Sequence, residues 1–575
     1  MATPANLLRH RVSGPSVANS QDASEEETEP LTAETNTRDG ENHASNKAHK
    51  SNDDQTETIE TISSRDGHRD KAAELLRAAG HSVIVTPDEN QRILRMIDWH
   101  ILPIILAIYC LQSLDKTALS YASVFGLVED LHLVDNQYSW SAAIVYVAQL
   151  VWQPLIAYFL VKLPLAKFCA IMVFCWGATL CGMVAAKDFG GLMAARFVLG
   201  SFEASVAPTF IALVQMWYRR VEQTNRNAAW YSMLGVVNIF GSLLSYGLAK
   251  IQSDTLRPFQ TIFLFCGALT VAFSVLVFIW LPDSPMQAKF LRGDDKLLAI
   301  ERLRMNQMGI SSGVWRWDHV KECFLDVKTW LWFSMLTAVS IPSGGITTFG
   351  PLIVKSFGFD SFTTILFNMP FGGVQLIATL GGAWAATRWK VKSPVLVVLC
   401  IPPIIGISLL LSLEHTPGNR GVLLFAYYLT SVYPAISPLI YSWSGQNTGG
   451  DTKRKATTAV LFIGASAGNI IGPNLYTTEQ APGYRSGLIS NLILFILIIV
   501  LVGLGVLWIA FLNRKHAVAR ERMGKAAEVV DLSMASGQVL ASTNGALNDT
   551  DETGVGQKAF DDMTDLANED FIYLM

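Results

Sequence analysis

The sequence predicts an all-α integral membrane protein with twelve transmembrane helices in two pseudo-symmetric six-helix bundles. Of the 575 residues, 50% are hydrophobic and only 16% are charged, whereas an ordinary soluble protein carries about 25% charged residues. A spanning helix needs about 20 mainly apolar residues. Twelve stretches meet this requirement and most lack the polar face of a soluble helix: 100–122, 138–161, 167–186, 190–215, 228–249, 260–281, 330–355, 364–387, 394–413, 420–442, 457–476 and 487–511.

A polar connection over residues 283–329 divides these stretches six and six. It separates an N-terminal bundle, 96–282, from a C-terminal bundle, 330–512. Residues 1–95 and 513–575 are polar tails, the second of them acidic. We expect the tails to be disordered, because such segments bury too little apolar area to offset the entropy lost on ordering. Two six-helix halves with a site between them near the midplane are typical of transporters.

The basic residues of the short loops predict the orientation of the chain, because Lys and Arg are enriched in cytoplasmic loops. The long connection falls on the side with the richer set of basic residues. We therefore expect both termini and the connection to be cytoplasmic. The basic residues of the short loops on this side are Lys162, Lys167, Arg219, Arg220, Arg226, Arg388, Lys390, Lys392, Lys453, Arg454 and Lys455.

Several function classes find no support in the sequence. The seven cysteines form no CxxC pair and no Cys/His cluster, so we expect neither a metal site nor a disulfide framework. We find no phosphate-binding loop and no nucleophile–base constellation, and we expect neither an enzyme nor a cofactor. The net charge of −4 and the short basic clusters do not indicate a nucleic-acid partner.

Four ionisable residues inside the predicted spans are the strongest functional candidates. Asp115 and Lys116 lie in the first span, and Arg196 and Glu203 lie in the fourth. Such residues are costly in a bilayer and are functional candidates by default. Arg196 precedes Glu203 by two helical turns on the same face, about 10 Å nearer the outside, which places it level with Asp115 and Lys116.

From these depths we expect an Asp115–Arg196 pair, with Glu203 left deeper and without an obvious partner. A lone membrane carboxylate can hold a proton. If Glu203 releases its proton in only one conformation, transport is tied to the proton gradient, and Lys116 is free to attract an anionic substrate. The alternative is a static ion-pair cluster that braces two helices.

Uncharged polar residues line several helical faces and form a second set of substrate-binding candidates. Such stripes also satisfy contacts between helices, so both interpretations stay open. The candidates are Gln149 and Asn238 in the first half, and Asn368, Gln375, Tyr433 and Asn469 in the second.

Six motifs follow one another in a specific order along the chain. They are MIDWHILP entering the first span, LDKTALSYA leaving it, RFVLGSFEASVAP in the fourth, WYRRVEQTNR after it, LPDSP closing the sixth, and NTGGDTKR before the eleventh. In this order they resemble the fungal allantoate permease branch of the anion:cation symporters, in the major facilitator superfamily. The resemblance spans residues 96–515. The version SLDKTALSYASVFGL is similar to the subgroup of thiamine-pathway transporters.

This resemblance implies the major facilitator fold and a role for each of the four charged residues. In the wider family an acid in the first helix and an acid in the fourth take part in proton coupling, and Asp115 and Glu203 match them. Lys116 matches the basic residue that contacts the substrate carboxylate, and Arg196 matches the arginine two turns before the second acid. Lys116 stands where arginine is commoner. Because an ammonium cannot form a bidentate fork, a simple carboxylate substrate is less secure.

We therefore expect a secondary active transporter that works by alternating access. The leading hypothesis is proton-coupled symport of a small organic anion, a vitamin or vitamin precursor, or a nitrogen compound. Its partners would be the solute, protons and membrane lipid, and we expect a monomer in the plasma membrane. Two alternatives stay open: a facilitator of a neutral or cationic solute, and a nutrient sensor that keeps the carrier fold and signals through its tails.

Overall fold

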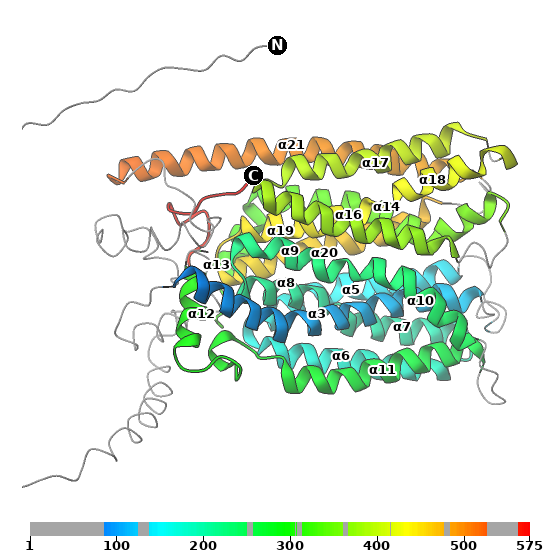
Figure 1. The fold of residues 1–575 in the computed structure, drawn as a ribbon, viewed down its shortest axis with the longest axis horizontal. Coiled ribbons are helices and arrows are strands. Elements are labelled where there is room, and N and C mark those ends of the chain that lie inside the picture. The colour runs from blue at the N-terminus through cyan, green and yellow to red at the C-terminus, as the bar shows by residue number, and fades with distance from the viewer. Residues whose placement is uncertain are drawn as a thin grey trace, which may run out of the picture. The chain divides into compact units, whose positions relative to one another are not determined.

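The computed structural model describes residues 85–124, 131, 137–249, 257–304, 306, 313–359, 366–414, 416–476, 483–525 and 562–575. All of them belong to one unit of the fold. Their secondary structure is helical, and no strand occurs among them. The long helices lie side by side along one direction (Figure 1), which confirms the all-α prediction. Most of the predicted N-terminal tail, residues 1–84, lies outside the described residues.

The first predicted bundle is built from eight α-helical segments of the described chain. They begin and end as follows: α3 Pro87–Val124, α5 Gln137–Lys162, α6 Leu165–Gly182, α7 Phe189–Glu203, α8 Val206–Trp217, α9 Arg220–Tyr231, α10 Met233–Ala249 and α11 Pro258–Trp280. A short 3-10 helix, η1 Met183–Ala185, extends α6.

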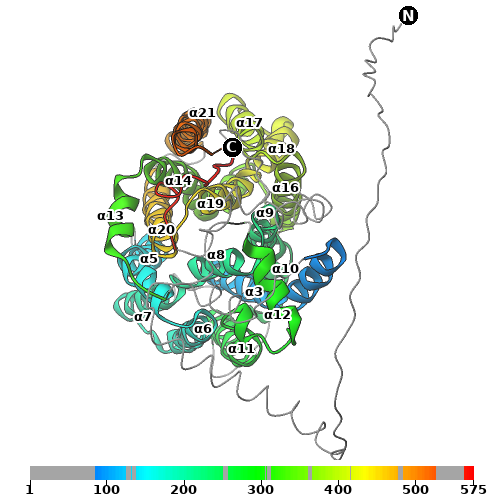
Figure 2. The same cartoon turned by 90° about the vertical axis from the view of Figure 1, so that its left-hand side faces the viewer.

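The polar connection forms the short helices η2 Pro285–Gln287, α12 Asp294–Arg304 and α13 Trp317–Leu325. The second bundle follows: α14 Val327–Ser356, α16 Asn368–Trp389, α17 Ser393–Ser412, η3 Pro417–Asn419, α18 Arg420–Thr430, η4 Tyr433–Ala435, α19 Ile436–Gln446, α20 Asp451–Asn474 and α21 Arg485–Arg522. Viewed end-on, the helices of the two bundles form two groups that face each other (Figure 2).

Each of the twelve predicted spans falls mainly on helices where the structure describes it. In the described chain, nine helical stretches are long and apolar enough to cross a membrane, which confirms nine of the spans by this measure. In the other three ranges, 228–249, 330–355 and 364–387, the described residues are mainly helical, as α9 with α10, α14 and α16. Large apolar side chains such as Ile279, Ile493 and Leu507 are exposed on the outside of the helices, as a lipid-facing surface requires.

The fourth predicted span is broken where a proline removes a backbone donor. α7 ends at Glu203, and α8 begins at Val206. Pro208 has no N–H to donate to the carbonyl of Ala204, four residues earlier. The side-chain amide of Gln153 in α5 donates to this carbonyl instead, at 3.1 Å. The break therefore ties α5 to the helix that carries Glu203.

The two halves approach closely where α10 packs against α16. Gly235 in α10 faces Gly372 in α16, and a Cβ on either residue would lie 2.6 Å from the carbonyl oxygen of the other. The side-chain amide of Asn238 donates to Gln375 Oε1 at 2.7 Å across the same contact. Small residues permit this kind of close approach between membrane helices.

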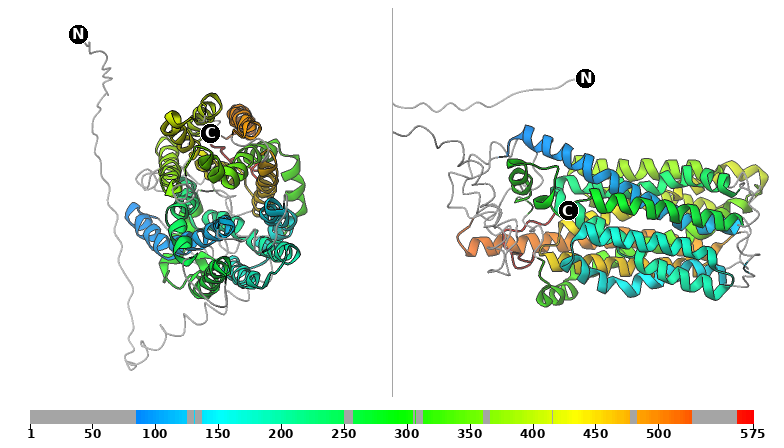
Figure 3. Two further views of the ribbon diagram at one scale, coloured as in Figure 1. Left: turned by 90° about the vertical axis from the view of Figure 1, so that its right-hand side faces the viewer. Right: turned by 90° about the horizontal axis from the view of Figure 1, so that it is seen from below.

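One end of the bundle carries α12, α13, the start of α3 and residues 562–575, and we call it the linker end (Figures 1 and 3). Charged motifs join its parts. Arg302 of α12 donates to Glu222 of α9 at 2.6 and 2.8 Å, and Arg226 of α9 pairs with Asp98 of α3 at 2.7 Å. Asp283 of LPDSP caps α6 by accepting from the backbone N–H of residues 166 and 167, at 3.0 and 3.1 Å.

The second tail differs from the expectation. We expected residues 513–575 to form a disordered acidic tail. The structure instead continues α21 to Arg522 and packs residues 562–575 against the linker end, where Asp565, Phe571 and Tyr573 are buried. The polar composition concealed the short run FIYLM at residues 571–575, which supplies the apolar area that ordering requires.

Candidate functional site

The charged residues of the first and fourth spans meet inside the bundle. α3 carries Asp115 and Lys116, and α7 carries Arg196 and, at its last position, Glu203. The Lys116 Nζ atom lies 3.1 Å from Glu203 Oε1. The Glu203 side chain is 0% exposed, whereas that of Lys116 is 34% exposed. The pair therefore has a buried acid and a base that keeps access to its surroundings.

This pairing differs from the sequence expectation, in which Glu203 lacked a partner and Lys116 was free. The depth estimate placed Glu203 about two turns below Lys116. It did not allow for the long lysine side chain, which reaches along the helix axis. In the structure, Lys116 is engaged with the deeper acid.

The other acid, Asp115, has a different main contact from the one expected. Its Oδ2 atom accepts a hydrogen bond from the indole N–H of Trp176 in α6, at 2.8 Å. The expected ion pair between Asp115 and Arg196 is not formed, although Arg196 and Glu203 both lie within electrostatic reach of Asp115. Asp115 is 1% exposed, and its Oδ1 atom has no hydrogen-bond partner among the described residues.

Arg196 braces two helices of the first half. Its Nε atom in α7 donates to the backbone carbonyl of Ser141 in α5 at 2.8 Å, and both residues are buried. A guanidinium bound to a backbone carbonyl keeps its positive charge. Arg196 therefore contributes a fixed charge within electrostatic reach of Asp115.

Tyrosines from both halves surround the ion pair. Lys116 Nζ lies 5.8 Å from the ring centre of Tyr146, and the rings of Tyr109 and Tyr231 are stacked 5.7 Å apart. Ser437 of α19 lies within electrostatic reach of the Tyr231 hydroxyl, so this cluster reaches the second half. Tyr433 of the second half lies within electrostatic reach of Tyr146 and Tyr231. The ion pair thus lies where the halves meet.

The sequence pattern of the Major Facilitator Superfamily matches residues 105–473, more than half of the chain. The chain belongs to the major facilitator superfamily. It is 33% identical over 407 residues to the Thiamine pathway transporter THI73 of Saccharomyces cerevisiae, covering 70% of this chain and 77% of that one. It is 28% identical over 471 residues to the Allantoate permease of the same yeast, covering 79% and 86%. These relatives confirm the predicted branch of the superfamily.

Solved structures support the same fold. The structure of the MFS proton:xylose symporter XylE is similar with a TM-score of 0.56 and 12% identity, covering 70% of this chain and 94% of that one. At this identity the likeness concerns the fold alone. The protein is a multi-pass membrane transporter, because its family and its apolar spans agree.

The uncharged residues that the sequence suggested for substrate binding lie in different environments in the structure. Asn238 and Gln375 bind each other across the halves, at 2.7 Å. The Tyr433 hydroxyl lies 3.3 Å from Thr347 Oγ1 in α14. Asn469 donates to the Ala465 carbonyl of its own helix, at 2.9 Å. Gln149 is buried in α5, and Asn368 is half-buried at the start of α16.

Tyr109 and Trp176 are among the residues of the site that were not sequence candidates. Tyr109 precedes Lys116 by seven residues and therefore shares its helical face, so the spacing contained a signal. Trp176 lies among other apolar residues of the third span, and nothing in its surroundings marked it as the donor to Asp115. No group of three or more His, Cys, Asp and Glu side chains in the described part of the chain is arranged to hold a metal ion.

Proposed function

We propose that this transporter of the major facilitator superfamily is a proton-coupled symporter. Its proposed solute is a small organic anion, a vitamin or vitamin precursor, or a nitrogen compound. The observation that carries the proposal is the Lys116–Glu203 ion pair, with a fully buried acid and a partly exposed base. The names of the relatives, a thiamine pathway transporter and an allantoate permease, support a small organic solute. Asp115 and Glu203 are the proposed coupling acids, and Lys116 and Arg196 are the proposed anion-binding residues.

The geometry supplies a physical route to coupling. Lys116 neutralises Glu203 in the empty site. When an anionic solute binds the Lys116 ammonium, it competes with Glu203 for the same charge. An uncompensated carboxylate in a low-dielectric interior is strongly disfavoured and takes up a proton instead. The solute and the proton therefore bind together, and the net charge of the site is unchanged.

Alternating access exposes this loaded site to each side in turn. The site lies between the halves, so a rocking motion of one half against the other opens it to one side and closes it to the other. We propose that the linker end faces the cytosol, because its loops carry the richer set of basic residues. The plasma membrane is the proposed location, and the monomer is the proposed unit of transport.

An uptake screen in cells tests this function. Radiolabelled vitamins, small carboxylates and nitrogen compounds are offered at two external pH values, with and without a protonophore. We expect accumulation of one anionic solute that rises at the lower pH and collapses with the protonophore. Uptake that equilibrates without accumulation, and that neither the pH nor the protonophore changes, contradicts proton coupling and favours facilitated diffusion.

The variant Lys116→Ala tests the proposed anion-binding role of Lys116 in the same uptake assay. We expect at least a tenfold weaker apparent affinity, because the ammonium contact contributes about 1.5–3 kcal/mol as a charged hydrogen bond. Lys187→Ala, at an exposed position beside the predicted outer loop, is the matched control and should transport normally. Normal affinity in Lys116→Ala removes Lys116 from the site.

A further inference from the structure

The segment 562–575, DMTDLANEDFIYLM, combines acidic residues with a run of apolar ones. It carries four acidic side chains and no basic one, and it ends in a run of apolar residues. Asp565 is 0% exposed and Phe571 1% exposed. We call residues 562–575 the tail segment. Its burial shows that the linker end holds a site shaped for it.

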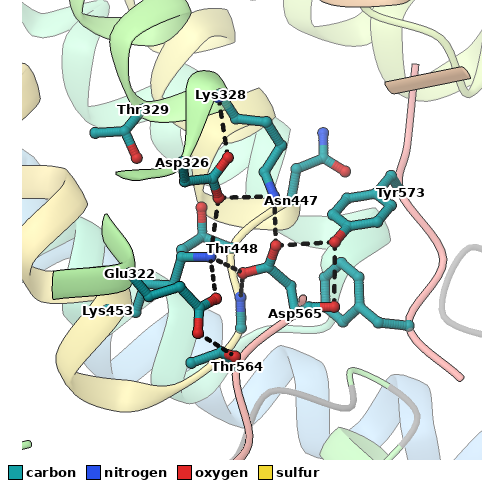
Figure 4. Close-up of polar contacts among 12 residues, drawn as sticks. Glu322, Asp326, Lys328, Thr329, Asn447, Thr448, Lys453, Thr564, Asp565 and Tyr573 are labelled. Carbon is teal, nitrogen blue, oxygen red and sulfur yellow. Dashed lines mark hydrogen bonds and ion pairs between the residues drawn. The ribbon is translucent and has the colours of Figure 1, made fainter. Parts of the chain in front are cut away.

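Charge complementarity anchors the first part of the tail segment (Figure 4). Lys453 Nζ contacts Asp565 at 2.8 Å, Asp326 at 2.9 Å and Glu322 at 2.8 Å. Lys328 Nζ contacts Asp326 at 3.0 Å and also Asp565. Without Asp565, two buried ammonium groups would share Asp326 and the partly exposed Glu322, which is costly in a dry interior.

The ionised state of Asp565 follows from the same contacts. Burial by itself raises the pKa of this carboxyl, but the ammonium groups of Lys328 and Lys453 outweigh burial and hold the pKa below its ordinary value. The carboxylate is therefore charged at the pH of a cell. The Oδ1 atom of Asp565 also accepts a hydrogen bond from the backbone N–H of Gly449, at 3.0 Å.

Two asparagines bind the backbone of the second part as they would bind a peptide ligand. Asn447 accepts from the Leu574 N–H at 2.7 Å and donates to the Leu574 carbonyl at 2.9 Å. Asn513 of α21 does the same for Tyr573, at 3.0 and 2.9 Å. The indole of Trp443 adds a bond to the Leu574 carbonyl at 2.8 Å. Paired donors and acceptors of this kind recognise extended backbone.

The tail segment also reaches the first half, through Arg220 of α9. Arg220 Nη2 donates to the Ile572 carbonyl at 3.0 Å, and its guanidinium lies 4.9 Å from the Phe571 ring centre. The same guanidinium donates to the carbonyl of Gln446 in α19, and Gln446 Nε2 donates back to the Arg220 carbonyl at 2.6 Å. The segment therefore covers a direct contact between the halves.

We propose that the linker end carries a peptide-binding site whose ligand is the tail segment, and that the bound segment latches the halves together at this end. Most of the segment's partners, including Lys328, Lys453, Asn447 and Asn513, belong to the second half. The contacts of the tail segment with Arg220 must break when the halves separate at this end. This inference therefore rests on the alternating access proposed above. Release of the acidic, apolar-ended peptide then favours opening, as in other switches in which a segment orders and disorders.

Chemical labelling of the contact between the halves tests the latch. Ser442 of α19 is 1% exposed and accepts a hydrogen bond from Asn227 of α9 at 3.0 Å, so a cysteine at position 442 reacts when the linker end opens. The Ser442→Cys chain is purified in detergent and treated with a maleimide. Peptide mass spectrometry measures modification at residue 442 itself, so the native cysteines do not interfere.

We expect deletion of residues 562–575 to raise the labelling rate at residue 442 at least about fivefold, the lower range of coupling between sites. The full-length variant Asp565→Asn, which keeps the shape of the side chain and removes its charge, should raise it similarly. Ala567→Ser, at an exposed position of the same segment, is the control and should label like the parent. The buried native cysteines Cys169 and Cys400 should stay unreactive in every folded variant.

A synthetic peptide of residues 562–575 separates a latch from a merely structural tail. Added to the deletion variant, it should restore protection of residue 442, whereas the same peptide with Asp565→Asn should not. If the deletion variant exposes Cys169 and Cys400, it is unfolded and Asp565→Asn decides the matter. An unchanged rate at residue 442 in Asp565→Asn, or equal protection by both peptides, overturns the proposal. The assay uses no solute, so its failure is distinct from failure of the proposed transport.

Discussion

At the scale of single residues, the candidate site contains four charged side chains in the interior of the bundle, and each of them needs a partner. Lys116 contacts Glu203, Trp176 donates to Asp115, and Arg196 binds a backbone carbonyl. Each charge thus has a different kind of partner. The partner of Glu203 is a flexible ammonium that a solute can also reach. In the proposed mechanism, Glu203 is therefore the acid that takes up the proton when the solute binds.

Gln153 is a second residue whose role follows from a single bond. Its amide supplies the donor that Pro208 cannot give to the Ala204 carbonyl. We predict that Gln153→Leu lowers stability by about 1–3 kcal/mol, the cost of leaving a buried acceptor unsatisfied. Thermal unfolding of the purified protein in detergent measures this loss.

The control for Gln153→Leu restores the missing donor. In the double variant Gln153→Leu/Pro208→Ala, the N–H of residue 208 can bond the Ala204 carbonyl directly, and most of the stability should return. A double variant as unstable as Gln153→Leu alone would show that the glutamine acts through packing.

At the scale of elements, the contact between α10 and α16 decides how closely the halves can meet. Gly235 and Gly372 are adjacent there, and the Asn238–Gln375 bond lies beside them. Sequence analysis placed Asn238 and Gln375 among the substrate-binding residues. The structure gives each of them the other as partner, which is the alternative role that polar stripes commonly have in membranes.

Two neighbouring glycines of α16 provide a matched pair of variants. We predict that Gly372→Ala destabilises the protein and impairs transport, because its Cβ would lie 2.6 Å from the Gly235 carbonyl oxygen and nearby backbone must shift. Gly373→Ala meets nothing within 4 Å and should be neutral or more stable by up to about 1 kcal/mol, the helix-propensity gain. Equal melting temperatures for both variants would show that the close approach is not needed.

At the scale of the whole molecule, the sequence predicted the architecture well because membranes impose long apolar helices. The branch of the superfamily, the all-helical fold and nine of the twelve spans followed from composition and motif order. The break after Glu203 was not predicted, since it depends on Gln153 of another helix replacing a donor. The Lys116–Glu203 pair was missed because depth along a helix does not fix how far a lysine reaches.

The tail segment was also missed by the sequence prediction, because its partners are distant in the sequence. Composition alone indicates disorder for residues 513–575, but Asp565 finds two buried lysines and Tyr573 finds Asn513. These partners lie in the second bundle, far away in sequence. In the proposed latch, the tail segment controls the separation of the two halves at the linker end.

The most direct test of the central claim measures proton movement with solute in reconstituted vesicles. The solute identified by the uptake screen is supplied outside, and a pH-sensitive dye records proton entry into wild-type and Glu203→Gln vesicles. We predict that the wild type takes up protons with the solute. In contrast, Glu203→Gln should exchange solute across the membrane without net proton entry, because its amide cannot be protonated when the anion engages Lys116. The same number of protons per solute in both proteins would contradict the account.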